Sequence, residues 1–231
     1  ADTFSILSLG TRADADTWQA GAAGLGLQAG KIIKKPNPSL ADLKAFFSRS
    51  DDWLFIAGHF TDHLYNHAKT IKIWFKKDSV VIEHPDGNAT LARGGDFKQH
   101  VKAAVLFWGG CNVHSDVARV EAHRALFQKS TVMVGWLAIT GWEIVDVNCG
   151  GKGSGTNKQT TNFFSLMAGS STASLARTNW LSSADKIAWG QDSAGNAYRP
   201  RFSVVDETGQ EWLLMGNVTT DKGQTKGRKF N

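Results

Sequence analysis

The sequence predicts a single α/β domain, residues 1–231, in which a mostly parallel sheet carries helices on both faces as a three-layer sandwich. Three observations predict this fold class. Strand-like and helix-like segments alternate along the chain, two short apolar runs end in glycine, and no linker or internal repeat divides the 231 residues. Such alternation is typical of parallel sheets, because a right-handed β-α-β crossover returns each strand beside an earlier one. A content of 42% hydrophobic residues is enough for a substantial core.

The expected strands are short runs rich in apolar, β-branched or aromatic residues, bounded by glycine, proline or polar turn sequences. In chain order they cover residues 4–9, 53–59, 71–75, 80–83, 103–111, 131–139, 201–205 and 211–215, with a short strand or a turn at 24–27. The two runs 53–59 and 103–111 are almost wholly apolar, which is typical of strands buried on both faces of a parallel sheet.

The expected helices are segments of good helix formers or of apolar residues at helical spacing. In chain order they cover residues 13–23, 40–48, 96–102, 116–128, 159–168 and 172–181. Ser39 follows Pro36 and Pro38 and is the expected N-cap of the second helix, as Ser115 is of the fourth.

Four segments are expected to depart from this alternation. A hairpin insertion at about 68–90 separates the two most apolar strands, and a glycine-rich stretch at about 148–158 has the composition of a mobile loop. The last two strands are expected to close a hairpin in which Gly209 supplies a positive φ. The basic tail 222–229 is expected to be a solvated, frayed end.

Composition gives weak indications about partners and location. The net charge of +5 is spread along the chain, and most of the nine tryptophans sit inside apolar runs, so we do not expect nucleic-acid binding. No apolar run approaches the roughly eighteen residues that span a bilayer, and the first residues lack the features of a signal peptide. We therefore expect a soluble protein, either cytoplasmic or secreted after removal of a signal.

A histidine and a cysteine follow the two most apolar runs. Gly58 closes the first run and His59 follows it, whereas two glycines close the second run before Cys111. If the runs are neighbouring parallel strands, His59 and Cys111 meet at the carboxyl edge of the sheet, where open α/β sheets place their sites. An imidazole within hydrogen-bond reach of a thiol stabilises the thiolate and can later protonate the leaving group.

This arrangement resembles the caspase-fold cysteine peptidases, a group that includes caspases, metacaspases, gingipains and the CHAT-domain proteins. The separation of 52 residues between His59 and Cys111 is close to the roughly fifty found in caspases. A helix and then a hydrophobic strand carrying Trp136 follow Cys111, which resembles the CHAT pattern. The likeness covers about residues 50–145.

The resemblance implies a cysteine endopeptidase that acts on a protein or peptide substrate through an acyl-enzyme and needs no metal or cofactor. It implies that Cys111 is the nucleophile and His59 its partner. The backbone N–H groups of Cys111 and Phe60 would then form the oxyanion hole, because Phe60 follows the histidine.

The resemblance allows two hypotheses about which substrate side chain the protein recognises. Arg12 follows the first strand, where caspases carry an arginine that binds an acidic substrate side chain. Acidic residues such as Asp62 and Glu143 would instead line a pocket for arginine or lysine. Trp136 is expected in the core or in the wall of that pocket.

A second hypothesis is a catalytically inactive, caspase-like module that binds another protein. The family usually has glycine after the histidine and alanine before the cysteine, whereas this chain has Phe60 and Gly110 there. These departures leave a weak or degenerate enzyme open as well. The second cysteine, Cys149, could also pair with Cys111 and silence the nucleophile until it is reduced.

A third hypothesis is a metal-binding protein. His59, His63 and His67 recur every four residues, and on a helix this spacing places three imidazoles on one face. Cys111 and His114 would be further ligands for zinc or a similar metal. Against this hypothesis, the segment lacks a clear helix start, and no glutamate completes a His-Glu-x-x-His motif.

Overall fold

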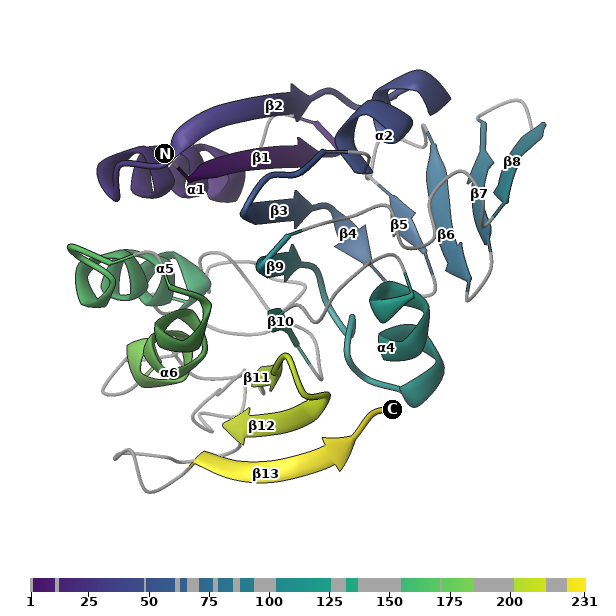
Figure 1. The fold of residues 1–231 in the computed structure, drawn as a ribbon. Helices are drawn as coiled ribbons and strands as arrows, with labels where there is room; N and C mark the ends of the chain where they lie inside the picture. Colours follow the sequence, from purple (N-terminus) through teal and green to yellow (C-terminus); the bar gives the residue numbers. More distant parts are fainter. Residues whose placement is uncertain are drawn as a thin grey trace, which may run out of the picture.

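A computed structural model of the chain has two β-sheets with helices packed around the larger one (Figure 1). The structure describes residues 2–10, 13–47, 49–60, 63–65, 71–76, 79–84, 88–93, 103–125, 132–136, 155–170, 172–184, 202–214 and 224–231. Within them, an eight-stranded sheet has the order β13-β12-β11-β10-β9-β3-β1-β2, and a five-stranded sheet has the order β4-β5-β6-β7-β8. The fold is therefore α/β, as predicted.

The parallel half of the large sheet contains the strands that the sequence marks as most buried. Its strands are β2 (Gln28–Lys34), β1 (Thr3–Ser8), β3 (Trp53–Ala57), β9 (Val105–Gly109) and β10 (Val132–Trp136). Each strand is parallel to the next in this order. All five residues of β3 are buried, as expected for a strand covered on both faces.

The second strand lies later in the chain than its expected position. Helix α1 (Ala13–Gly24) ends in a turn in which Gly26 has φ +84° and the Leu27 N–H donates to the Ala22 carbonyl. This is a glycine C-cap of the Schellman type, so the turn interpretation of residues 24–27 is confirmed. Strand β2 follows and contains Lys31 and Lys34.

Three antiparallel strands complete the large sheet: β11 (Phe202–Val205), β12 (Gln210–Leu214) and β13 (Gln224–Lys229). The predicted hairpin of β11 and β12 is confirmed, with Gly209 at φ +83°. The expectation of a frayed basic tail is wrong, because residues 224–229 form an edge strand paired with β12. Its Arg228 binds Glu211, which is buried and needs a cationic partner.

Helices cover both faces of the large sheet. Helices α1, α5 (Gly155–Leu166) and α6 (Ala173–Ser183) lie on one face, and α2 (Leu40–Phe47) and α4 (Val117–Arg124) lie on the other (Figure 1). The predicted three-layer arrangement is therefore present. None of the helices in the described part of the chain has the length and apolar character needed to cross a bilayer.

The helix starts confirm one predicted cap and correct another. Ser39 caps α2, since its Oγ accepts from the Asp42 N–H at 3.1 Å and its own N–H donates to the Asp42 carboxylate. The N-cap of α4 is Asp116, not Ser115, because the Asp116 carboxylate accepts from the Arg119 N–H at 2.8 Å.

Two further predictions fall partly or wholly outside the described residues. Helix α5 begins at Gly155, so the expected loop over 148–158 is wrong in its last four residues. Residues 148–154 and the expected helix 96–102 lie outside the described ranges.

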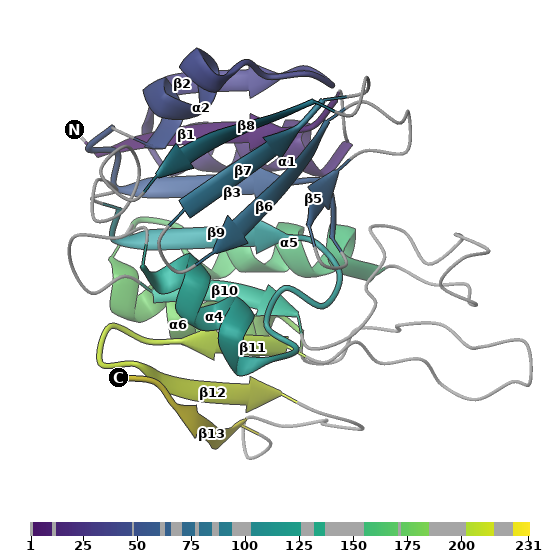
Figure 2. The same cartoon turned by 90° about the vertical axis from the view of Figure 1, so that its right-hand side faces the viewer.

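The insertion between β3 and β9 is a whole antiparallel sheet rather than a hairpin alone. The expected hairpin is present as β6 (Lys72–Lys76) and β7 (Ser79–Glu83), and its partners are β4 (His59–Phe60), β5 (Leu64–Tyr65) and β8 (Ala89–Arg93). Figure 2 shows this second sheet in front of the large sheet, beside α2 and α4. Its Val80 and Ile82 are buried, which indicates that one face packs on the core.

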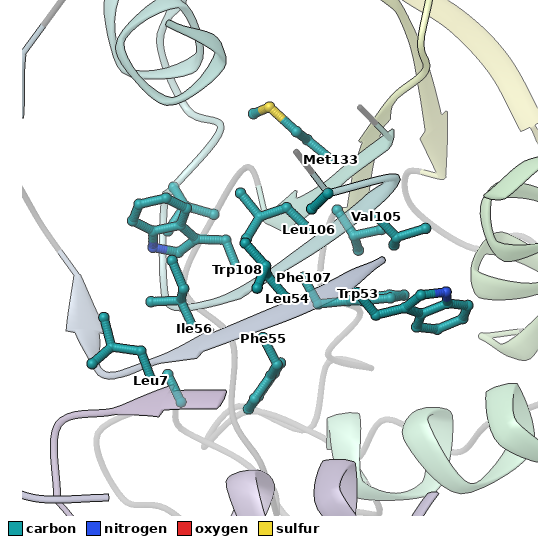
Figure 3. Close-up of a cluster of buried hydrophobic side chains, with 14 of the residues drawn as sticks. Leu7, Trp53, Leu54, Phe55, Ile56, Val105, Leu106, Phe107, Trp108 and Met133 are labelled. Carbon is teal, nitrogen blue, oxygen red and sulfur yellow. The ribbon is translucent and has the colours of Figure 1, made fainter. Parts of the chain in front are cut away.

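Aromatic and aliphatic side chains of the central strands pack together in the core of the large sheet (Figure 3). On one face, Trp18 of α1 stacks on Phe55 with ring centroids 4.7 Å apart. On the other, Trp108 stacks on His123 of α4 at 3.9 Å and meets Phe75 of β6 at 4.8 Å. The second sheet is thereby fixed to the strand that leads to Cys111.

Candidate active site

The register of β3 and β9 brings the chain segments that carry His59 and Cys111 together. The five paired positions, from Trp53 with Val105 to Ala57 with Gly109, all differ by 52 residues. The Gly58 N–H extends this ladder by donating to the Gly109 carbonyl at 3.4 Å. Continued two positions beyond both strands, the same offset would align His59 with Cys111, although His59 itself pairs with Tyr65 of the second sheet. Adjacent strands lie about 4.8 Å apart, which is within the reach of a histidine side chain.

The two strand ends stay in contact after the ladder stops. The Gly110 N–H donates to the Trp108 carbonyl at 3.1 Å, so the chain turns sharply before Cys111. A Cβ atom on Gly110 would lie 2.9 Å from the Phe60 Cβ and 3.3 Å from the Gly58 carbonyl oxygen. Glycine therefore permits the close approach of the cysteine segment to the histidine segment.

Cys111 starts a tight turn with an unusual backbone conformation. The residue is half-buried, and the next residue, Asn112, has φ +58°. Asparagine tolerates this left-handed conformation better than most residues, and such residues cluster at functional sites. The Asn112 carbonyl accepts from the Ser115 N–H at 3.1 Å, which closes the turn just before α4.

Arg119 of α4 connects this turn to the residue after His59. Its Nη1 donates to the Asn112 carbonyl at 3.0 Å and to the Ser115 hydroxyl at 2.8 Å. Its guanidinium carbon lies 5.6 Å from the centroid of the Phe60 ring, within the range of a cation–π interaction. One side chain thus contacts both halves of the candidate site.

Phe60 places its ring in the core and its backbone at the candidate site. The residue is 3% exposed, and its ring meets Trp108 edge-on at 6.0 Å and His123 at 5.7 Å. The bulky residue after His59 is therefore accommodated beneath the surface.

His59 belongs to a cluster of rings at the start of the second sheet. It pairs with Tyr65 across β4 and β5, with ring centroids 5.6 Å apart, and Tyr65 also lies 5.1 Å from His63. Because His59 lies on a strand that pairs with β5 just after His63, the helical spacing on which the metal hypothesis rests is wrong here. Within the described residues no three His, Cys, Asp or Glu side chains are grouped as metal ligands, and His67 lies outside them.

The structure gives no side-chain geometry for the remaining predicted site residues. Arg12, Asp62 and Glu143 lie outside the described residues, as does Cys149. Trp136 is the last residue of β10, where its backbone pairs with Phe202. The specificity pocket and the proposed disulfide therefore stay predictions from sequence.

A buried polar network lies behind the Cys111 turn. The His114 Nδ1 is 3.0 Å from the Ser203 hydroxyl, which donates to Glu211 at 2.5 Å. Arg228 donates to Glu211 at 2.6 Å and also to the His114 carbonyl at 2.5 Å, which closes a ring of contacts. Since the Ser203 hydroxyl donates to the carboxylate, its oxygen accepts from His114, and Nδ1 is the protonated nitrogen of that ring.

Burial explains the protonation of this network. It lowers the pKa of His114 to about 4, against the opposing attraction of Glu211. The pKa of Glu211 is lowered although burial opposes this, because Arg228 and Ser203 donate hydrogen bonds to the carboxylate. The pKa of His123 is also lowered well below its ordinary value, first by burial and then by His114 and Arg119. Both buried histidines are therefore neutral at neutral pH.

Sequence reasoning missed the residues that hold the site together. Arg119 reaches Phe60, and His114, proposed from the sequence only as a metal ligand, reaches Ser203 and Arg228. Spacing along the chain does not reveal these distant contacts. One local signal exists, because asparagine directly after a cysteine at a strand end is typical of a left-handed turn residue.

A comparison with protein-family models finds no match to this chain, and a comparison with curated protein sequences finds none either.

Proposed function

We propose that this protein is a cysteine endopeptidase of caspase-like type, with Cys111 as nucleophile and His59 as its general acid–base partner. The observation that carries the proposal is the register of β3 and β9, whose last pair, Ala57 with Gly109, lies two residues before His59 and Cys111. The carboxyl edge of a parallel sheet is where α/β proteins place catalytic residues. The inserted sheet and the helices on both faces agree with the resemblance from sequence.

The reaction follows from the chemistry of these two groups. His59 accepts the thiol proton of Cys111, and the thiolate attacks a peptide carbonyl to form a tetrahedral oxyanion. The C–N bond then breaks, and the leaving amine takes a proton from the imidazolium while a thioester remains on Cys111. Water, deprotonated by His59, hydrolyses the thioester and restores the thiol. No metal or cofactor is required.

Backbone N–H groups would stabilise the oxyanion. By the resemblance these belong to Cys111 and Phe60, and two features favour that role. The Phe60 ring is buried, and Gly110 allows the two backbone segments to approach closely. Loss of one such donor reduces rates by about 10² to 10³, so small displacements here would strongly reduce activity.

The proposal predicts an activated thiol at Cys111. We expect iodoacetamide to alkylate Cys111 at a thiolate-like rate well below pH 8, because His59 stabilises the thiolate, and His59→Ala to abolish that low-pH reactivity. The rate is measured by mass spectrometry on reduced protein, in a Cys149→Ser background that removes the second thiol.

A matched control and a contrary result complete this test. His84→Gln removes a half-buried histidine that directly follows β7 and should leave the profile unchanged. A rate that rises only near the ordinary thiol pKa of about 8.5 and does not depend on His59 would exclude the dyad. Such a result would favour the inactive binding module.

A further inference from the structure

Arg119 occupies a position that the two-residue dyad does not explain. Its side chain is only 20% exposed, and its Nε lies 3.2 Å from the Asp116 carboxylate at the start of α4. Asp116 in turn accepts from the Arg119 N–H, so the side chain is fixed at its base. An arginine that forms several directed contacts keeps its planar donor group in one orientation.

Arg119 first forms hydrogen bonds to the turn that follows the proposed nucleophile. Nη1 donates to the Asn112 carbonyl and to the Ser115 hydroxyl. Asn112 is the residue with φ +58°, a left-handed conformation that asparagine tolerates better than most residues. The hydrogen bond to its carbonyl fixes the peptide group one residue beyond Cys111.

The second target is the residue after the proposed base. The guanidinium covers the Phe60 ring at 5.6 Å, and that ring is already held by Trp108 and His123. Phe60 is adjacent to His59 in the two-residue strand β4. Arg119 therefore spans from the cysteine segment to the histidine segment.

We propose that Arg119 is a positioning residue that sets the placement of Cys111 relative to His59 by holding the Asn112 carbonyl while its guanidinium packs on Phe60. This inference rests on the proposed cysteine peptidase function. It assigns Arg119 no contact with substrate. A misplacement of about 1 Å in a catalytic pair reduces rates by up to about 10²-fold, so the loss of Arg119 should be visible in the reactivity of Cys111.

Charge alone is a competing explanation, because a nearby cation also favours a thiolate. Lysine separates the two explanations. Arg119→Lys keeps the positive charge but lacks the planar group that reaches Asn112 and Ser115 while covering Phe60. Positioning by Arg119 therefore predicts that lysine restores little, whereas a charge effect predicts that lysine restores most of the reactivity.

The test measures the pH profile of Cys111 alkylation by iodoacetamide in the Cys149→Ser background. The variants are Arg119→Gln, Arg119→Lys, His59→Ala and the double variant His59→Ala/Arg119→Gln. Arg124→Gln is the matched control, since Arg124 lies on the same helix but donates to the Asn231 carbonyl at the far end of α4. Circular dichroism and Tm establish that each variant is folded.

We expect Arg119→Gln and Arg119→Lys to lower the alkylation rate at pH 6.5 by about 10- to 10²-fold. The double variant should match His59→Ala alone, because Arg119 acts through the histidine pair. Arg124→Gln should keep the original profile. If Arg119→Gln is not folded, the alkylation rate of Arg119→Lys is compared with that of the original protein instead.

The contrary outcomes are distinct. A folded Arg119→Gln variant that keeps the full His59-dependent profile overturns the role of Arg119 and leaves the dyad intact, and so does full restoration by Arg119→Lys. An original protein whose alkylation does not depend on His59 overturns the proposed function, and the role of Arg119 with it.

Discussion

Single residues at the two strand ends fix how closely the candidate catalytic segments approach. Gly110 is the clearest case, because any larger residue would place its Cβ against Phe60 and 3.2 Å from Val113 Cγ1. The sequence shows two glycines before Cys111 and predicts a turn there. It does not show which segment packs against them, because that depends on the register of strands 52 residues apart.

This contact predicts a clear difference between two glycine substitutions. Gly110→Ala should lower the free energy of unfolding by about 1–3 kcal/mol through overpacking. Gly24→Ala is the matched control, because a Cβ there meets no atom within 4 Å and alanine is the better helix former. Urea unfolding of both variants measures the difference. Equal stability would contradict the close approach of Gly110 to Phe60.

At the scale of elements, the positions of the most apolar strands are easier to predict from the sequence than the ends of the elements or the helix caps. The apolar runs that became β3 and β9 are evident in the sequence, since burial on both faces requires such runs. Strand β13 was missed because its residues are basic and glycine-rich. It is a strand because its backbone pairs with β12, and Arg228 adds an ion pair with the buried Glu211.

The His114 network joins β11, β12 and β13 to the Cys111 turn and makes stability depend on pH. The folded pKa of His114 is about 4, whereas an unfolded histidine has a pKa of 6.5. Between these values the unfolded chain binds a proton that the folded protein excludes. The contribution of His114 is therefore full above pH 6.5 and is lost as pH falls toward 4, by on the order of 3 kcal/mol.

Urea unfolding at several pH values between 4 and 8 checks this expectation. The His114→Gln variant should lose less stability than the original protein over that interval, although buried His123 keeps some loss of the same sign. His84→Gln should retain the full loss. Equal pH dependence in the His114→Gln variant and the original protein would show that His114 is not held neutral by burial.

At the scale of the whole molecule, the alternation of strands and helices predicted the α/β class, the parallel sheet and the helices on both faces. The second sheet was predicted only as a hairpin, because β4 and β5 have two residues each and carry no periodic signal. His59 and Cys111 were identified because each follows a buried strand. The residues that position them were not, because their contacts cross between elements.

The central claim is that Cys111 cleaves peptide bonds with the help of His59. Its most direct measurement is the digestion of a mixed peptide library by the reduced protein, with new peptide ends identified by mass spectrometry. We predict cleavage by the original protein and by Cys149→Ser, and at least a 10²-fold loss in Cys111→Ala and His59→Ala. Cleavage that persists in Cys111→Ala, or an uncut library with folded, reduced protein, would contradict the account.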